Sequence, residues 1–209
     1  MSSGITIEEV RLALRAPLPG ILAQRRMGTR PRISPEEFEH DSPPREGAVL
    51  ILLYPLDGQL HLPLTRRTQR VADHKGEISL TGGAREVADA SFWDTALREA
   101  SEELAINPQN VERLAALSPL YIPSSNFDIH PFVGYAAVRP AFVPDANEVA
   151  EVIEMPLQSL LDPSAKSEET WVRRGKEIRV PFYCYHQHVI WGATAMVLSE
   201  LEVMLAGSL

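Results

Sequence analysis

The stretch that decides the fold runs from the glycine pair Gly82-Gly83 to the acidic segment Arg98-Glu99-Ala100-Ser101-Glu102-Glu103. Positions three and four apart lie side by side on an α-helix, so the sequence predicts Glu99, Glu102 and Glu103 in one sector of a helix. Arg98 is expected to pair with Glu102 one turn on. The opposite side carries a stripe of apolar residues that would pack on the core: Trp93, Leu97, Ala100 and Leu104. Hard divalent cations prefer such carboxylate clusters, and the alternative for these residues alone is a solvated acidic surface.

The order of these elements resembles the Nudix box of the Nudix hydrolases. The residues in the roles of that motif are Gly83, Asp89, Arg98, Glu99, Ala100, Glu102, Glu103, Ala105 and Ile106. Asp89 replaces a glutamate of the family pattern, one additional residue separates it from Arg98, and Ala105 replaces a glycine suited to a left-handed helix cap. We therefore expect the helix end to shift, with Asn107 turning the chain and Pro108 stopping the helix.

A second motif, upstream of the first, resembles the signature of the coenzyme A diphosphatase branch of the family. The matching residues are Leu64, Thr65, Arg67, His74, Gly76, Glu77, Gly82 and Gly83, and the departures are Pro63, Thr68, Ala72, Leu80 and Thr81. Ala72 replaces an arginine, so the reaction class is better supported than coenzyme A as the substrate. Arg66, Arg67 and Arg70 suit phosphate oxygens, the alternative being a charged strand end. His74 is expected either to contact phosphate or to hold a loop in place.

The resemblance implies an α/β (α+β) Nudix fold, in which a mixed β-sheet is sandwiched between helices. It also implies Mg²⁺ or Mn²⁺ held by Glu99 and Glu103, with Glu102 contributing. Water would be the nucleophile, Glu102 or Glu148 the general base, and Arg98 the residue that orients the glutamates. The glycine pair is expected to form a turn whose backbone approaches metal or phosphate. The alternative for Glu148 is an exposed strand edge.

The activity that the resemblance implies is metal-dependent hydrolysis of a nucleoside diphosphate linked to another group. The leading candidate substrate is coenzyme A or an acyl derivative, split into adenosine 3′,5′-bisphosphate and phosphopantetheine. The first alternative is a Nudix hydrolase that acts on ADP-ribose, a dinucleotide or a nucleoside triphosphate. An alternative of another class is a non-catalytic Nudix module that binds a nucleotide. Ala105 and the divergent upstream motif favour that module, whereas the complete set of box glutamates opposes it.

The composition indicates one substantial core in a chain of 209 residues, of which 44% are hydrophobic. Residues 1–45 are expected to form a partly helical, proline-rich extension that wraps the domain or a neighbouring subunit of a homodimer, and residues 46–209 to form the Nudix domain. A net charge of −8 argues against a nucleic-acid binder with a broad basic surface. The single Cys184 suits a reducing cytoplasm, and no apolar run approaches the ~20 residues of a membrane span.

Hydrophobic periodicity predicts the remaining elements. Further helices are expected at 5–15, 21–27 and 194–206, and strands at 48–54, 59–64, 111–122, 130–138, 169–173 and 178–185. Ser91 should cap the box helix, which begins near Phe92, and Asp57-Gly58 predicts a hairpin turn. The second strand alternates as if one face were covered, and the last helix carries a one-sided apolar stripe for packing on the sheet. The break at 123–126 suits a substrate loop.

Overall fold

The computed structural model describes residues 4–31, 38, 40–70, 76–173 and 175–207. These residues form an eight-stranded mixed β-sheet with the path β3-β2-β1-β7-β5, on which β4 pairs with β1, β6 with β7 and β8 with β2. The strands are β1 (Arg45–Leu56), β2 (Gln59–Arg67), β3 (Ile78–Ser79), β4 (Thr81–Ala84), β5 (Glu112–Ala116), β6 (Leu120–Ile122), β7 (Phe127–Tyr135) and β8 (Val149–Pro156). Because β1 runs parallel to β7 and antiparallel to β2 and β4, it is the strand that joins the parts of the sheet.

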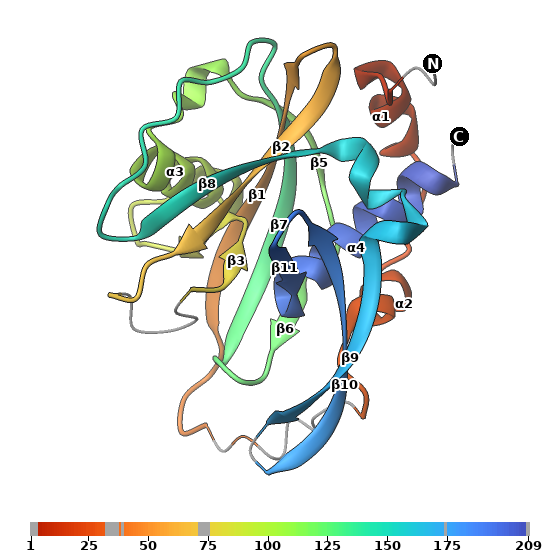
Figure 1. Ribbon diagram of the computed structural model, residues 1–209. Coiled ribbons are helices and arrows are strands. Elements are labelled where there is room, and N and C mark those ends of the chain that lie inside the picture. The colour runs from red at the N-terminus through yellow and green to blue at the C-terminus, as the bar shows by residue number, and fades with distance from the viewer. Residues whose placement is uncertain (1–3, 32–37, 39, 71–75, 174, 208–209) are drawn as a thin grey trace.

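Helices cover both faces of this sheet, as Figure 1 shows. α3 (Phe92–Leu104) lies on one face, and α4 (Gly192–Ala206) lies on the other with α1 (Ile7–Ala13) and α2 (Ile21–Gln24). Short 3₁₀ turns are found at Arg25–Met27, Pro108–Asn110, Leu157–Leu160 and Pro163–Ala165. The predicted mixed sheet between helices is therefore confirmed.

A smaller sheet extends away from the main one beside α4 (Figure 1). It is built in the order β11-β10-β9 from β9 (Lys166–Arg173), β10 (Lys176–Tyr185) and β11 (His188–Trp191). β11 leads directly into α4, so the small sheet fixes where that helix starts. In the part of the chain that the structure describes, no helix combines the length and the apolar character needed to cross a membrane.

After its exposed start at Arg45 and Glu46, β1 is apolar because both of its faces are covered. Successive side chains of a strand point to opposite faces, and here each face meets a helix. Leu50 and Leu52 belong to the cluster that includes the apolar stripe of α3, whereas Ile51 and Leu53 belong to the cluster around α4. All four side chains are fully buried, which contributes about 1.5–3 kcal/mol each. This packing fixes the position of α3 relative to the sheet.

The second strand, β2, is covered on both faces, so the expectation of one covered face is wrong. His61 and Pro63 alternate with the buried leucines and are themselves buried. The additional cover comes from Tyr54, whose ring stacks on His61 and meets the ring of Phe142 at its edge. The ladder with β1 extends only from Gln59 to His61, so Pro63 lies beyond the part of β2 that must donate to that strand.

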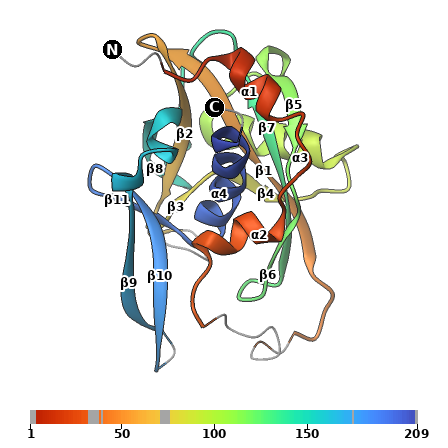
Figure 2. The same ribbon diagram turned by 90° about the vertical axis from the view of Figure 1, so that its right-hand side faces the viewer.

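α4 is buried on most of its sides, so the expectation of a one-sided stripe is also wrong. Glu200 is 0% exposed and Glu202 is 4% exposed. The elements that cover them supply hydrogen-bond donors: Gln24 Nε2 donates to Glu200 at 3.1 Å, and the Tyr183 hydroxyl donates to Glu202 at 2.7 Å. Figure 2 shows α1 and α2 on either side of the middle of α4 along the vertical direction, and α2 meets α4 at Ser199 and Glu200. The periodicity of α4 alone did not indicate this cover, because the covering residues lie far away in the sequence.

The two ends of α3 are fixed by different devices. Ser91 caps the first turn as predicted. Ala105 adopts the left-handed conformation at the other end, with φ 56° and ψ 31°, so the expected shift of the helix end is wrong. The Ala105 N–H donates to the Ser101 carbonyl at 2.9 Å, and the Val143 N–H donates to the Leu104 carbonyl at 3.0 Å. These bonds hold the last turn in place, which offsets the roughly 1–2 kcal/mol that this conformation costs a non-glycine residue.

Candidate active site

The three box glutamates of α3 lie in two different environments. Glu103 is only 3% exposed, and the side chain of Glu99 is 15% exposed. The side chain of Glu102, by contrast, is 59% exposed. Glu99 and Glu103 are one turn apart and face β4, whereas Glu102 lies at the rim. The predicted single acidic face is thus divided into an inner pair and an outer carboxylate.

The glycine pair lies on strand β4 opposite Ala48 and Val49 of β1, so the expected turn is in fact a strand. A Cβ on Gly83 would lie 2.5 Å from Oε1 of Glu99. A Cβ on Gly82, whose φ is +155°, would overlap the backbone of β1. Glycine at position 83 therefore lets the Glu99 carboxylate approach β4 directly, and glycine at position 82 lets β4 pair closely with β1.

The Arg98 guanidinium connects the helix to the loop that precedes it. Its Nε and Nη2 atoms each lie 3.1 Å from the Asp89 carboxylate, and Nη2 also donates to the Ala84 carbonyl at 2.8 Å. Nη1 donates to Glu99 at 2.9 Å and to Glu102 at 3.0 Å. The predicted pairing of Arg98 with Glu102 is confirmed. Because Arg98 is held at several points, it restrains the carboxylate of Glu99.

Asp89 is the anchor of this network. The carboxylate also accepts hydrogen bonds at 2.9 Å from the Glu86 N–H and from the Thr95 hydroxyl. The hydrogen bond from Arg98, supported by these other donors, lowers the pKa of Asp89 to about 2. A carboxylate with so many donors stays ionised and keeps Arg98 fixed. Asp89 thus holds Arg98 in position and is not one of the side chains that face β4.

Glu148 is brought to the site by the loop that follows β7. The Asp145 N–H donates to the Glu103 carbonyl at 2.9 Å, and the Glu148 N–H donates to the Asp145 carbonyl at 3.0 Å. On the other side, the Thr68 N–H donates to the Glu148 carbonyl at 2.9 Å. Burial is the main cause that raises the pKa of Glu99 and of Glu103, and the charge of Glu148 raises both further. Of the two environments that the sequence left open for Glu148, the structure favours the one beside the box.

Glu103 is the most strongly perturbed carboxylate of the site. Burial raises its pKa to about 8, against the opposing effects of the Arg67 charge and the Gly82 N–H, and the charges of Glu99 and Glu148 raise it further. Burial likewise raises the pKa of Glu99 above its ordinary value. Among the described residues, Oε2 of Glu103 is buried with no hydrogen-bond partner. Arg98 beside Glu99 and Arg67 beside Glu103 therefore offset only part of the cost of burying these carboxylates.

The inner carboxylates fit a hard divalent cation. Such a cation would add positive charge to that of Arg98 and Arg67 and would supply a partner for the unpaired oxygen of Glu103. Within the described ranges, no three acidic, histidine or cysteine side chains already form a complete ligand group. Glu99 and Glu103 would therefore supply a pair of protein ligands, and Mg²⁺ commonly takes one or two carboxylates and completes its shell with water and substrate phosphates.

The arginine cluster predicted for phosphate is divided by the alternation of β2. Arg67 lies close enough to Glu103 to lower its pKa and lines the cavity described below. Arg66 points to the other face, where it pairs with Glu151 at 2.5 Å. Arg70 is exposed beyond the end of β2. His74 lies outside the described residues. The structure therefore brings only Arg67 of this group to the box glutamates.

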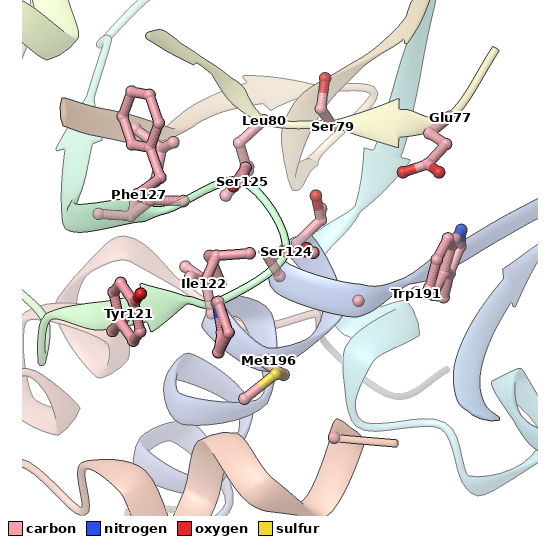
Figure 3. A pocket seen from close by; sticks show the side chains of 18 of the residues that line it. Glu77, Ser79, Leu80, Tyr121, Ile122, Ser124, Ser125, Phe127, Trp191 and Met196 are labelled. Atoms are coloured by element: carbon pink, nitrogen blue, oxygen red, sulfur yellow. The ribbon is translucent and has the colours of Figure 1, made fainter. Parts of the chain in front are cut away.

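A cavity of about 1130 Å³ opens beside the glycine pair and Arg67. Figure 3 shows the side chains that surround it, among them Ser124 and Ser125 of the loop expected to meet substrate. Four further arginines line this cavity and were not identified from the sequence: Arg25, Arg30, Arg45 and Arg173. The basic run Arg25-Arg26, in an otherwise acidic chain, is the signal that would have drawn attention to the extension.

Comparisons with known proteins agree with this geometry. The family model described as "NUDIX domain" matches residues 44–175. The chain is 37% identical over 164 residues to NudL of Pectobacterium atrosepticum, an uncharacterized Nudix hydrolase, covering 78% of this chain and 83% of the relative. It is 35% identical over 178 residues to a NudL of Escherichia coli, covering 84% and 88%.

Solved structures share the fold at lower sequence identity. The crystal structure of a MutT/nudix family protein from Enterococcus faecalis is 17% identical with a TM-score of 0.53, covering 95% of this chain and 73% of that one. This likeness concerns the fold alone. Together with the matching family model and the NudL relatives, the box on α3 and β4 leads to one conclusion. The chain belongs to the Nudix hydrolases, a family of pyrophosphohydrolases, as the resemblance in its sequence predicted.

Proposed function

We propose that this Nudix hydrolase cleaves the diphosphate of coenzyme A or an acyl derivative, giving adenosine 3′,5′-bisphosphate and phosphopantetheine. The observation that carries the proposal is the charge of the cavity beside the box. Among the described residues that line it, the cationic side chains are five arginines and the single carboxylate is Glu77. Coenzyme A carries a diphosphate and an additional 3′-phosphate, and guanidinium groups bind phosphate oxygens well. In a chain of net charge −8, this local excess favours a ligand with several phosphates.

The residues of the box would share the work of binding and activation. Glu99 and Glu103 would hold Mg²⁺ or Mn²⁺, and Glu102 would contribute from the rim. When bound, the cation neutralises the diphosphate and makes water more acidic. Arg98 would keep Glu99 in position. Gly82 and Gly83 would keep the diphosphate close to the backbone of β4 and to the Glu99 carboxylate, which lies against Gly83.

Two carboxylates remain candidates for the general base, which takes the proton from the attacking water. Glu148 is supported by its position, because its charge acts on both Glu99 and Glu103. Glu102 is 59% exposed and already paired with Arg98, which leaves it less suited to accept a proton at the centre of the site. We assign the role of general base to Glu148 and a supporting role to Glu102.

Arg67 would bind the diphosphate itself. It lies beside Glu103, and its Nε is buried without a hydrogen-bond partner among the described residues. A charge-assisted hydrogen bond contributes about 1.5–3 kcal/mol, so Arg67→Ala should lower kcat/KM by roughly 10- to 150-fold. Arg66→Ala is the matched control, because Arg66 precedes it on β2, points to the other face and pairs with Glu151.

The test is a comparison of kcat/KM for coenzyme A, 3′-dephospho-coenzyme A, ADP-ribose, a dinucleotide and a nucleoside triphosphate, with Mg²⁺ or Mn²⁺ present. We expect coenzyme A to give the highest value and 3′-dephospho-coenzyme A a lower one. A higher value for ADP-ribose, or for any other alternative, would overturn the assignment of substrate while leaving the family unchanged. Binding without turnover of any of these compounds would favour a non-catalytic module.

The same proposal includes a cytoplasmic location. Cys184 is the single cysteine of the chain and is free in the structure, so the fold does not depend on an oxidising compartment. Nucleotide diphosphates such as coenzyme A are also compounds of the cell interior.

A further inference from the structure

Much of the cavity wall comes from segments outside the region that the family model matches. That region covers residues 44–175. Among the wall residues, Ile21, Arg25 and Arg30 precede it, and Ile178, Met196 and Val197 follow it. The glycine pair Gly82-Gly83 thus lies on one side of the cavity, while the extension and the start of α4 form another side.

Beside the arginines that the extension contributes, Arg25 and Arg30, the cavity has a wall that is largely apolar. Ile178, Met196 and Val197 belong to it, and Leu80 and Ile122 of the main sheet complete the same lining. Figure 3 shows Met196 and Ile122 near one another at the side of the cavity that α4 forms. The volume of about 1130 Å³ is slightly above that of ordinary ligand pockets, which span roughly 300–1,000 Å³. An apolar lining of this size suits a ligand with a long apolar part.

The extension is held firmly enough to act as a fixed wall. Glu200 of α4 accepts hydrogen bonds at 3.1 Å from the Gly20 N–H and from Gln24 Nε2. The Ser199 hydroxyl donates to the Ala23 carbonyl at 2.9 Å. Farther along, the backbones of Arg30 and Arg179 exchange hydrogen bonds of 2.9 Å and 2.7 Å. Residues 20–30 are therefore bound to the domain at both ends.

We propose that this apolar wall binds the acyl chain of a coenzyme A thioester, so that the enzyme selects among thioesters by chain length. The inference rests on the proposed function, because the diphosphate must first be placed at Gly82-Gly83. The phosphopantetheine arm would lead away from the glycine pair into the cavity, and the acyl chain would follow it toward Met196. The specificity would then come from the flanking segments, and the chemistry from the box.

The size of the effect follows from the hydrophobic contribution of each methylene group. Burial of one CH₂ contributes about 0.8 kcal/mol, which corresponds to an increase of about fourfold in kcat/KM. The value should rise with each added CH₂ until the cavity is full and then level off. Free coenzyme A, which has no acyl chain, should give the lowest value of the series.

The experiment measures kcat/KM for free coenzyme A and for its acetyl, butyryl, hexanoyl, octanoyl, decanoyl and palmitoyl thioesters. The parent is compared with Met196→Trp, which fills the wall, and with Met196→Ala, which enlarges the cavity. Leu22→Trp is the matched control, because Leu22 is 78% exposed on the extension and does not line the cavity. A merely structural defect would lower all values in a variant, whereas the proposal predicts that the preferred chain length moves.

The inference predicts a preference for shorter chains in Met196→Trp, for longer chains in Met196→Ala, and the parental preference in Leu22→Trp. Equal kcat/KM for free coenzyme A and all thioesters in the parent would overturn the inference and leave the proposed function standing. A preference that is the same in both Met196 variants and the parent would overturn it too. Failure to hydrolyse any coenzyme A compound would overturn the proposed function and this inference with it.

Discussion

Replacing Glu103 by glutamine should stabilise the metal-free protein at alkaline pH and at the same time remove its activity. Glu103 is 3% exposed, and its pKa is raised from 4.5 to about 8. An acid whose pKa rises on folding holds its proton more tightly in the folded state. The folded protein therefore carries no penalty below about pH 4.5, an increasing penalty as the pH rises, and the full penalty above about pH 8.

The magnitude follows from the difference between these pKa values. At about 1.36 kcal/mol for each pH unit, the full penalty is roughly 5 kcal/mol, and at pH 7 it is roughly 3 kcal/mol. Glutamine keeps the shape of the side chain and the acceptor for the Gly82 N–H, but its amide group also needs a partner in this buried position. We therefore expect Glu103→Gln to recover roughly 1–3 kcal/mol at pH 8.5 and little at pH 5.

The assay is urea unfolding of the parent and the variant at pH 5 and pH 8.5 with a chelator present. Glu102→Gln is the matched control on the same helix, because Glu102 is largely exposed and its replacement should change stability by less than about 1 kcal/mol at either pH. Turnover with Mg²⁺, measured on the same samples, should fall by several orders of magnitude in Glu103→Gln. A difference in stability that does not depend on pH would refute the reasoning about burial, and near-normal turnover would refute the assignment of Glu103 as a metal ligand.

Three other variants test the residues that hold the box and the extension in place. Gly83→Ala should displace the Glu99 carboxylate, lowering kcat/KM more than about tenfold while thermal unfolding changes little. Asp89→Asn should lower the free energy of unfolding in urea by about 1–2 kcal/mol at pH 7, because it removes the carboxylate that pairs with Arg98. The pKa of this carboxylate is lowered on folding, so its ionised form stabilises the fold above about pH 4, and this stabilisation is lost as the pH falls through about 2. The loss of turnover in Asp89→Asn should be smaller than that of a box glutamate. Glu200→Ala should lower the free energy of unfolding by about 3 kcal/mol or more, because its buried donors would lose their acceptor.

Local patterns predicted the parts of the fold that local forces determine. The cap at Ser91, the pairing of Arg98 with Glu102 and the turn at Asp57-Gly58 each depend on residues a few positions apart. The helical period also placed Glu99 and Glu103 on one side of α3. It did not show that Glu102 would lie at the rim, because the depth to which each glutamate is buried depends on where β4 and the loop after β7 meet the helix.

The features missed from the sequence depend on contacts between distant segments. Ala105 keeps the left-handed cap because backbone N–H groups of the loop after β7 donate to the last carbonyls of α3. That loop is too far from α3 in the sequence for helix periodicity to predict the contact. The sequence around Glu200 predicts an exposed polar position on a surface helix. In the structure the extension and Ser118 bury Glu200 and donate hydrogen bonds to it. The cavity likewise joins the extension, the main sheet and the start of α4. Each of these contacts joins residues that lie far apart in the sequence, so no single stretch predicts it.

The most direct test of the account is hydrolysis of coenzyme A by the folded protein with Mg²⁺, run beside Glu103→Gln, with both products identified by mass spectrometry. The account predicts that the parent releases adenosine 3′,5′-bisphosphate and phosphopantetheine in equal amounts, and that the variant, folded by circular dichroism, releases neither at a comparable rate. Intact coenzyme A after incubation with the parent, or equal product from the parent and Glu103→Gln, would contradict it.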